Sequence, residues 1–168
     1  MATRTAVLPR AIRPSAGAPD WVLAAPFRAH VTYLMSNAHV PWPVIAHQAS
    51  IPLATLRTLL FGRGGRSRAK ITRDAATRLI GVGLDDLRWM LGAQVSAGPA
   101  GARIRLLRGH HAPWANLARY LGISVATCQG YARGEYTSCS VMFDILTQTA
   151  CEAMDIIPWD EWGLEPPL

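Results

Sequence analysis

The sequence has little cysteine, almost no lysine and no long apolar run. Its three cysteines, Cys128, Cys139 and Cys151, are an odd number without Cys-x-x-Cys spacing. That pattern argues against a metal site or a disulfide framework and is typical of a reducing compartment. We therefore expect the three cysteines to serve as small apolar residues of the core. No apolar run reaches the roughly 18 residues of a membrane span, and the N-terminus lacks the pattern of a secretion signal. These absences predict a cytoplasmic protein with no membrane partner, cofactor or metal.

Positive charge is missing from the C-terminal part of the chain. All 17 basic residues lie within residues 1–133 beside four acids, and only Lys70 is a lysine. Residues 134–168 hold seven acids and no base, which leaves a net charge of +6 for the whole chain. Such asymmetry indicates one surface that faces a polyanion and one turned away from it.

Sustained period-2 alternation is also absent, so we expect no strands and an all-α fold. Thr72 is a candidate N-cap, and Gly62 is a candidate helix stop. The expected helices span residues 27–37, 42–49, 52–61, 73–82, 84–91, 103–109, 114–121, 125–133 and 140–154. The expected organisation is an N-terminal arm (1–19), a first domain (20–92), a linker (93–102), a second domain (103–157) and an acidic tail (158–168). Arg4, Arg10 and Arg13 in the arm fit a phosphate or minor-groove contact or a solvated tail.

Two stretches 72 residues apart are similar: PWPVIAHQASIPLATLRTLLFG begins at Pro41 and PWANLARYLGISVATCQGYARG at Pro113. Over residues 39–62, eight of 24 positions are identical in the two copies, where composition alone gives about two. Two copies are too few for a solenoid. We therefore expect two small helical domains related by internal duplication.

The pattern inside each copy resembles the helix-turn-helix of bacterial and phage DNA-binding proteins. In the second copy, Ala118 falls where two helices would cross, Gly122 falls in the turn, and Ser124 is placed to cap the following helix. The residues expected to face inward there are Leu117, Leu121, Ile123, Cys128 and Tyr131. The first copy has Ser50 in place of the turn glycine, which a serine tolerates at modest cost.

The resemblance implies that the second helix of each copy lies in the major groove of DNA. The implied contacts are Pro52, Leu53, Ala54, Arg57 and Thr58 in the first copy, and Ser124, Val125, Ala126, Thr127, Gln129 and Arg133 in the second. Arg57 suits guanine or a phosphate, and Gln129 suits adenine. Leu53 and Val125 fit either a thymine methyl group or packing between the helices.

A basic loop follows the first copy. Its sequence, GRGGRSRAKITRDAATRLIGV with the next helix, resembles the loop and capped helix that follow such motifs in actinobacterial and actinophage regulators. The cations that cluster here are Arg57, Arg63, Arg66, Arg68, Lys70 and Arg73, with no acid between them. They are expected to follow the phosphate backbone or to enter a minor groove. A weaker equivalent in the second copy comprises Arg103, Arg105, Arg108 and Arg119.

These features favour a sequence-specific regulator that binds double-stranded DNA. The expected protein is a repressor in the bacterial cytosol, near the nucleoid, that reads an asymmetric site as a monomer; immunity repressors of actinobacterial phages are the most similar class. No residues outside the two domains remain to house catalysis, so we expect no enzyme. The alternatives are a protein-binding adaptor or antitoxin-type module, a DNA-targeting accessory factor of recombination, and a non-specific chromosome-coating protein. Trp159 and Trp162 in the acidic tail are expected to dock on the second domain, or else to bind RNA polymerase or another protein.

Overall fold

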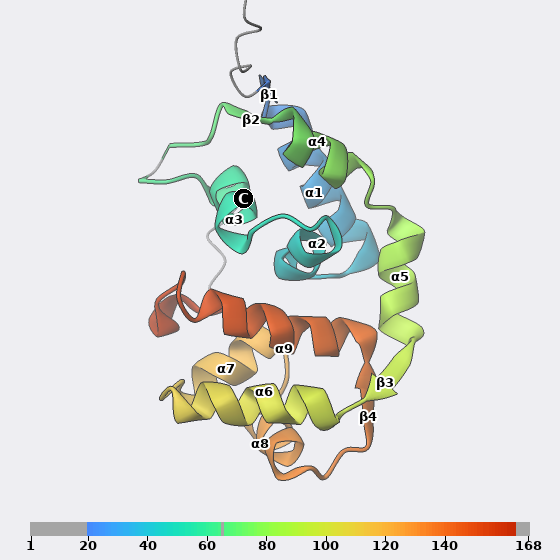
Figure 1. Ribbon diagram of the computed structural model, residues 1–168, viewed down its shortest axis with the longest axis vertical. Helices are drawn as coiled ribbons and strands as arrows, with labels where there is room; N and C mark the ends of the chain where they lie inside the picture. Colours follow the sequence, from blue (N-terminus) through green and yellow to red (C-terminus); the bar gives the residue numbers. More distant parts are fainter. Residues whose placement is uncertain (1–19, 65, 164–168) are drawn as a thin grey trace, which may run out of the picture.

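The computed structural model describes residues 20–64 and 66–163 (Figure 1). The expected arm and the end of the expected tail lie outside these residues. Helices dominate the described part of the chain, in agreement with an all-α expectation, together with short strands. The elements are β1 (Trp21–Leu23), α1 (Ala25–Ala38), α2 (Trp42–Gln48), α3 (Leu53–Phe61), β2 (Lys70–Thr72), α4 (Arg73–Ile80), α5 (Leu84–Gly92), β3 (Gln94–Ser96), α6 (Gly98–Gly109), α7 (Trp114–Leu121), α8 (Val125–Arg133), β4 (Ser138–Ser140), α9 (Val141–Ala153) and the 3₁₀ turn η1 (Trp159–Glu161).

The same order of elements occurs on both sides of α5: strand, three helices, strand, helix. β1 pairs antiparallel with β2, and β3 pairs antiparallel with β4 in the equivalent register. The strand pairs continue into matching backbone bonds, from Arg73 N to Asp20 O (2.7 Å) and from Val141 N to Ala93 O (2.9 Å). We call residues 20–80 the first half and residues 93–153 the second half.

The turns of the two halves also match. Ile51 N donates to Ala46 O at 2.9 Å, and Ile123 N donates to Ala118 O at 3.0 Å. The residue before each of these isoleucines has a positive φ, 53° at Ser50 and 66° at Gly122. Ser50 therefore adopts the turn conformation that glycine adopts in the second half, as expected. Arg78 Nη1 donates to Ser50 O at 2.9 Å and helps to hold the first turn.

Helix starts follow the expected capping chemistry. Thr72 Oγ1 accepts from Ala75 N at the start of α4, Ser124 Oγ from Thr127 N at the start of α8, and Ser140 Oγ from Phe143 N at the start of α9. Such caps satisfy backbone N–H groups that have no partner within the helix. Three of the boundaries that anchor the repeated frame therefore follow from single hydroxyl side chains.

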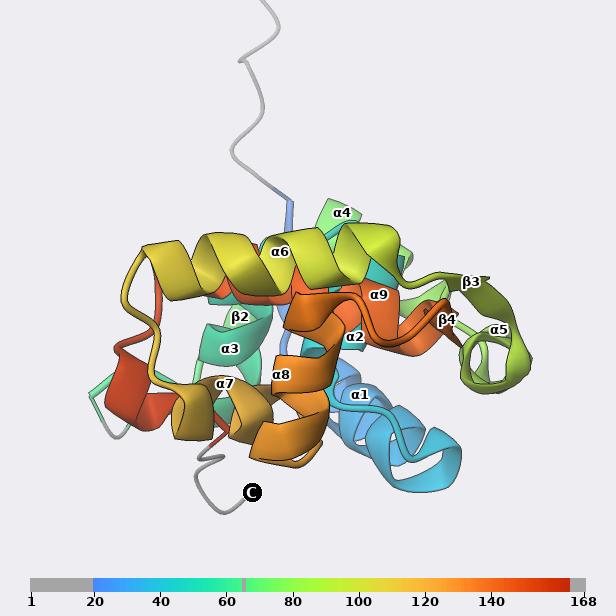
Figure 2. The ribbon, with the colours of Figure 1, turned by 90° about the horizontal axis from the view of Figure 1, so that it is seen from below.

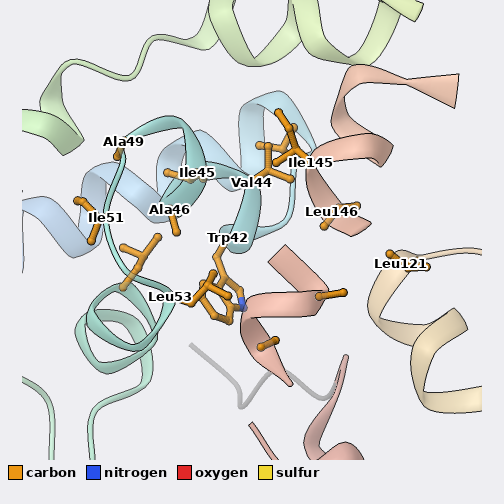
Figure 3. Close-up of a cluster of buried hydrophobic side chains, with 14 of the residues drawn as sticks. Trp42, Val44, Ile45, Ala46, Ala49, Ile51, Leu53, Leu121, Ile145 and Leu146 are labelled. Carbon is orange, nitrogen blue, oxygen red and sulfur yellow. The ribbon is translucent and has the colours of Figure 1, made fainter. Parts of the chain in front are cut away.

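The two halves pack through α9, which lies between α2 and α6 (Figure 1). Seen from below, α7 and α8 lie side by side on one side of α6 (Figure 2). Ile145 and Leu146 of α9 lie near Val44 and Trp42 of α2 in the shared core (Figure 3). The buried apolar side chains of both halves form one cluster.

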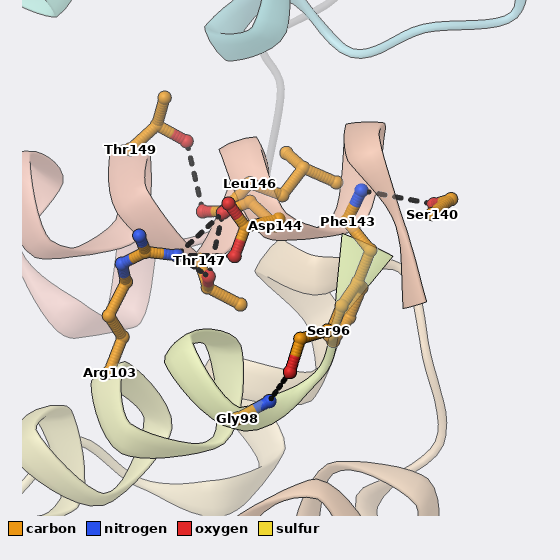
Figure 4. Close-up of polar contacts among 9 residues, drawn as sticks. All are labelled: Ser96, Gly98, Arg103, Ser140, Phe143, Asp144, Leu146, Thr147 and Thr149. Atoms are coloured by element: carbon orange, nitrogen blue, oxygen red, sulfur yellow. Dashed lines mark hydrogen bonds and ion pairs between the residues drawn. The ribbon is translucent and has the colours of Figure 1, made fainter. Parts of the chain in front are cut away.

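A polar network ties α6 to α9. Arg103 Nη1 donates to Asp144 Oδ1 at 2.6 Å and to Thr147 Oγ1 at 3.1 Å (Figure 4). Both members of the ion pair are about three-quarters buried, with exposed fractions of 28% and 25%. Arg103 is therefore a structural residue, which corrects its expected place among DNA-facing cations.

Three expectations about local structure were wrong. Short strands are present, although none was expected. Residues 93–102, expected to form a linker, hold β3 and the first turn of α6, which begins at Gly98 and not at residue 103. The segment expected to be a tail contributes η1 and the fully buried Trp162, so docking of this tryptophan is confirmed.

Candidate functional site

Helix α3 turns one side away from its buried leucines, and we call the two polar side chains on that side, Arg57 and Thr58, its polar stripe. Its apolar residues Leu53, Leu56 and Leu59 are each exposed by 1% or less. Ala54, Arg57, Thr58 and Phe61 occupy the other side of the helix, and Pro52 is exposed at its N-cap.

Leu53 belongs to the core and not to this stripe. It is only 1% exposed and lies next to Trp42 in the buried cluster (Figure 3). Its expected contact with DNA is therefore wrong, and the alternative of helix packing is confirmed. As the first residue of α3, it points back toward α2 and pins the start of the helix.

The basic loop, residues 62–70, begins with a backbone geometry that requires glycine. Gly62 has φ 75° and ψ −167°, a region that essentially only glycine occupies. A Cβ atom there would lie 2.3 Å from Arg66 O. Arg63 and Arg66 exchange two backbone hydrogen bonds of 3.0 and 3.2 Å, which makes the loop a tight hairpin.

The cations of the basic loop differ in how far they are engaged. Arg63, Arg66 and Lys70 are exposed and form no ion pair with any described residue. The Arg68 guanidinium lies 5.6 Å from the centre of the Trp21 ring, and its Nε donates to Lys70 O at 3.0 Å. Arg73 is paired with the Asp20 carboxylate, whose hydrogen bond and charge raise the pKa of the guanidinium.

A hollow of about 480 Å³ lies over the polar stripe of α3. The stripe forms its floor, Arg63 and Gly64 form one wall, and Ile156 lines it from the C-terminal part of the chain. In Figure 1 the basic loop extends to the left of and above α3, and the red C-terminal turn lies below α3. The polar stripe of α3 is therefore bordered by both segments.

Arg57, the expected guanine reader, is engaged within the protein. Its Nη2 forms an ion pair with Glu161 Oε2 of η1, 104 residues away in sequence. The two side chains remain 36% and 48% exposed. The sequence offered no periodic signal for this contact, because it depends on how the last turn folds back across both halves.

The equivalent helix in the second half, α8, carries fewer exposed polar side chains that could contact base edges. Val125 and Ala126 are exposed, and Gln129 is half-buried. Ser124 Oγ and Thr127 Oγ1 lie 2.8 Å apart and satisfy each other while capping the helix. Among the expected contacts of this half, Gln129 is the one polar side chain that the described residues leave without a hydrogen bond.

The loop after α8 covers the end of that helix. Glu135 accepts a hydrogen bond from Arg133 Nε at 2.6 Å, and this bond lowers the pKa of the carboxyl group. Gly130 of α8 is buried, and a Cβ atom there would lie 2.7 Å from the Tyr136 ring. The second half thus places an acid and an aromatic ring where the first half has its basic loop.

The other arginines of the second half bind backbone carbonyls. Arg105 donates to Ala132 O at 2.8 Å and Arg119 to Trp162 O at 3.4 Å. Arg108 donates to Ala112 O and lies 4.7 Å from the centre of the Trp114 ring. These cations keep their charge but are held by carbonyls at loops and helix ends, whereas Arg63, Arg66 and Lys70 of the first half form no ion pair or side-chain hydrogen bond with a described residue.

The described residues hold no group of three or more His, Cys, Asp or Glu side chains placed to bind a metal ion. Cys128 and Cys139 are buried as expected, and burial raises the pKa of the Cys128 thiol to about 11. Within the described ranges, no helix has the length and apolar character to cross a membrane. Comparison of the chain with protein-family models, curated proteins and solved structures found no match.

Proposed function

We propose that this protein is a transcriptional regulator that binds double-stranded DNA sequence-specifically, with α3 as its main reading helix. The observation that carries the proposal is the polar stripe of α3 beside the basic loop, whose hairpin exposes Arg63 and Arg66 and whose last residue is the exposed Lys70. In this arrangement α3 meets base edges in the major groove, while the basic loop contacts phosphates.

Two further features support a helix-turn-helix reading of α2–α3 and α7–α8. Each pair is joined by a short turn with a residue of positive φ and the same backbone bond back to the first helix. The matching strand registers support an internal duplication that produced both halves. We propose two copies of one unit, packed together through α9 rather than separated by a flexible linker.

The two copies contribute unequally in this proposal. α8 offers Gln129 and small apolar groups, whereas the cations of the second half are used within the protein. A monomer then contacts an asymmetric site, with most phosphate contacts on the side of the first half. Repression follows where the bound protein blocks access of RNA polymerase.

Selection of binding sites from random duplex DNA at about 150 mM salt, with the mass of the complex in solution, tests this function. We expect an asymmetric enriched site bound by a monomer. A palindrome bound by a dimer would mean that the second copy serves assembly. Absence of any enrichment would overturn sequence-specific regulation.

Matched substitutions separate reading from positioning. Arg57→Ala should weaken binding to the selected site by about 1–3 kcal/mol and relax preference at one base pair. Arg63→Ala should weaken binding to all sequences alike and lower the slope of log K against log salt by about 0.9. If Arg57→Ala also weakens binding to all sequences equally, Arg57 contacts phosphate and not a base.

A further inference from the structure

The C-terminal turn, residues 155–163, is built onto the second half by aromatic and polar contacts. Trp162 is fully buried, its ring centre 4.8 Å from that of Tyr120 and 4.5 Å from that of Trp159. Its indole N–H donates to Ile157 O at 3.0 Å, and Asn116 Nδ2 donates to Trp159 O at 2.5 Å. This turn therefore has a defined docked position.

From that position the turn reaches the first half at one charged contact. Glu161 pairs with Arg57 in the middle of the polar stripe of α3, and Ile156 lines the hollow over that stripe. Asp155 and Asp160 lie in the same turn, which contains no basic residue. An acidic segment thus borders the helix that the proposed function places against DNA.

Docking of this turn opposes entry of α3 into DNA for two physical reasons. A reading helix must protrude to fit a groove about 12 Å wide, whereas α3 forms the floor of a hollow. Carboxylates of the docked turn, beside α3, would also repel the phosphates that line the groove. One of these carboxylates, Glu161, already pairs with the Arg57 guanidinium.

We propose that the C-terminal turn is an autoinhibitory element, with Glu161 competing with DNA for Arg57. The inference rests on the proposed function and assigns its regulation to the same site. Docked and undocked arrangements of the turn are alternatives, and the undocked arrangement binds DNA. Conditions that stabilise docking lower DNA affinity, and bound DNA must in turn loosen the turn by linkage.

Substitution of Glu161 by Gln tests the competition directly. The matched control is Asp160→Asn, which removes the same charge from the same turn at a side chain that pairs with no described residue. An exposed ion pair corresponds to a factor of about 1.5 to 5 in an equilibrium constant. We therefore expect Glu161→Gln to bind the selected duplex about two- to fivefold more tightly than Asp160→Asn, measured by fluorescence anisotropy at about 150 mM salt.

Two further arms give the test independent readouts. In an Arg57→Ala background the difference between the two variants should disappear, as a double-mutant cycle requires. Asn116→Ala, which removes an anchor of the turn on α7, should also tighten binding. Hydrogen exchange of the Trp162 amide, which bonds to Trp159 O at 3.2 Å, should speed up when duplex is added.

The outcomes separate the two proposals. If wild type binds DNA but Glu161→Gln binds like Asp160→Asn, autoinhibition is overturned and the DNA-binding function stands. Weaker binding by Glu161→Gln would overturn it too, and would make Glu161 a positioning residue for Arg57. Unchanged exchange at Trp162 on saturation with DNA would mean that the turn stays docked. If no variant binds any duplex, both proposals fail.

Discussion

Replacement of Gly62 by alanine should cripple the basic loop while leaving the helices intact. The conformation at this residue costs a non-glycine side chain about 1–3 kcal/mol, and the added Cβ would lie 2.3 Å from Arg66 O. The backbone must therefore move and break the two hydrogen bonds between Arg63 and Arg66. The natural control is Gly64→Ala, because Gly64 also has a positive φ (57°) but a Cβ there meets nothing within 4 Å.

The expected loss can be derived from counterion release. If Arg63 and Arg66 each neutralise one phosphate, loss of both lowers the slope of log K against log salt by about 1.8. At about 150 mM salt the same two contacts are worth at most about 30-fold in affinity. Gly64→Ala costs about 1 kcal/mol of local backbone strain and should keep most of the slope.

Duplex titrations from about 50 to 300 mM salt measure the slope, and far-ultraviolet circular dichroism checks the helices of both variants. Because the loop lies outside the buried cluster, we expect helix content to change little in either, while the backbone strain lowers the thermal midpoint by a few degrees. An unaltered slope in Gly62→Ala, or equal losses in the two variants, would refute the assignment of the hairpin to phosphate contacts.

The other expectations concern stability and accessibility. Leu53→Ala should lower the free energy of unfolding by about 2–5 kcal/mol in urea titrations, because the side chain is buried. A loss below about 1 kcal/mol would contradict the burial of Leu53. Gly122→Ala should cost about 1–2 kcal/mol, whereas Ser50→Gly should be neutral or stabilise by up to about 1 kcal/mol, since both positions have positive φ. Alkylation at pH 8 should modify the half-buried Cys151 before Cys128, whose pKa burial raises to about 11; mass spectrometry that finds Cys128 modified first would contradict its burial.

Most helices of this fold can be predicted from the sequence because their signals are local. Periodic leucines mark α3, and the hydroxyl caps Thr72, Ser124 and Ser140 mark three helix starts. The strands escape prediction because three residues are too few for alternation to stand out, and their pairing joins residues such as Val22 and Ile71 that lie far apart in sequence.

The candidate site is predictable in its composition but not in its contacts. The residue types in the basic loop predict an anionic partner, and the structure leaves Arg63, Arg66 and Lys70 exposed. Sequence spacing could not reveal the ion pairs of Glu161 with Arg57 and of Asp144 with Arg103. It also could not reveal that Leu53, the first residue of α3, is buried. Each of these depends on the packing of α9 and the C-terminal turn across both halves.

One difference between the two halves is the length of the connection that follows α3 or α8. Eight residues separate α3 from β2, whereas four separate α8 from β4. The short connection must cross directly over α8, and so it lays Glu135 and Tyr136 on Gly130. The longer one has room to turn back on itself as a hairpin, which carries its cations away from the core. Because the strand registers fix both ends of each loop, the extra residues cannot be absorbed elsewhere. Loop length therefore contributes to the difference, because the longer connection leaves exposed cations beside α3 whereas the shorter one covers the end of α8.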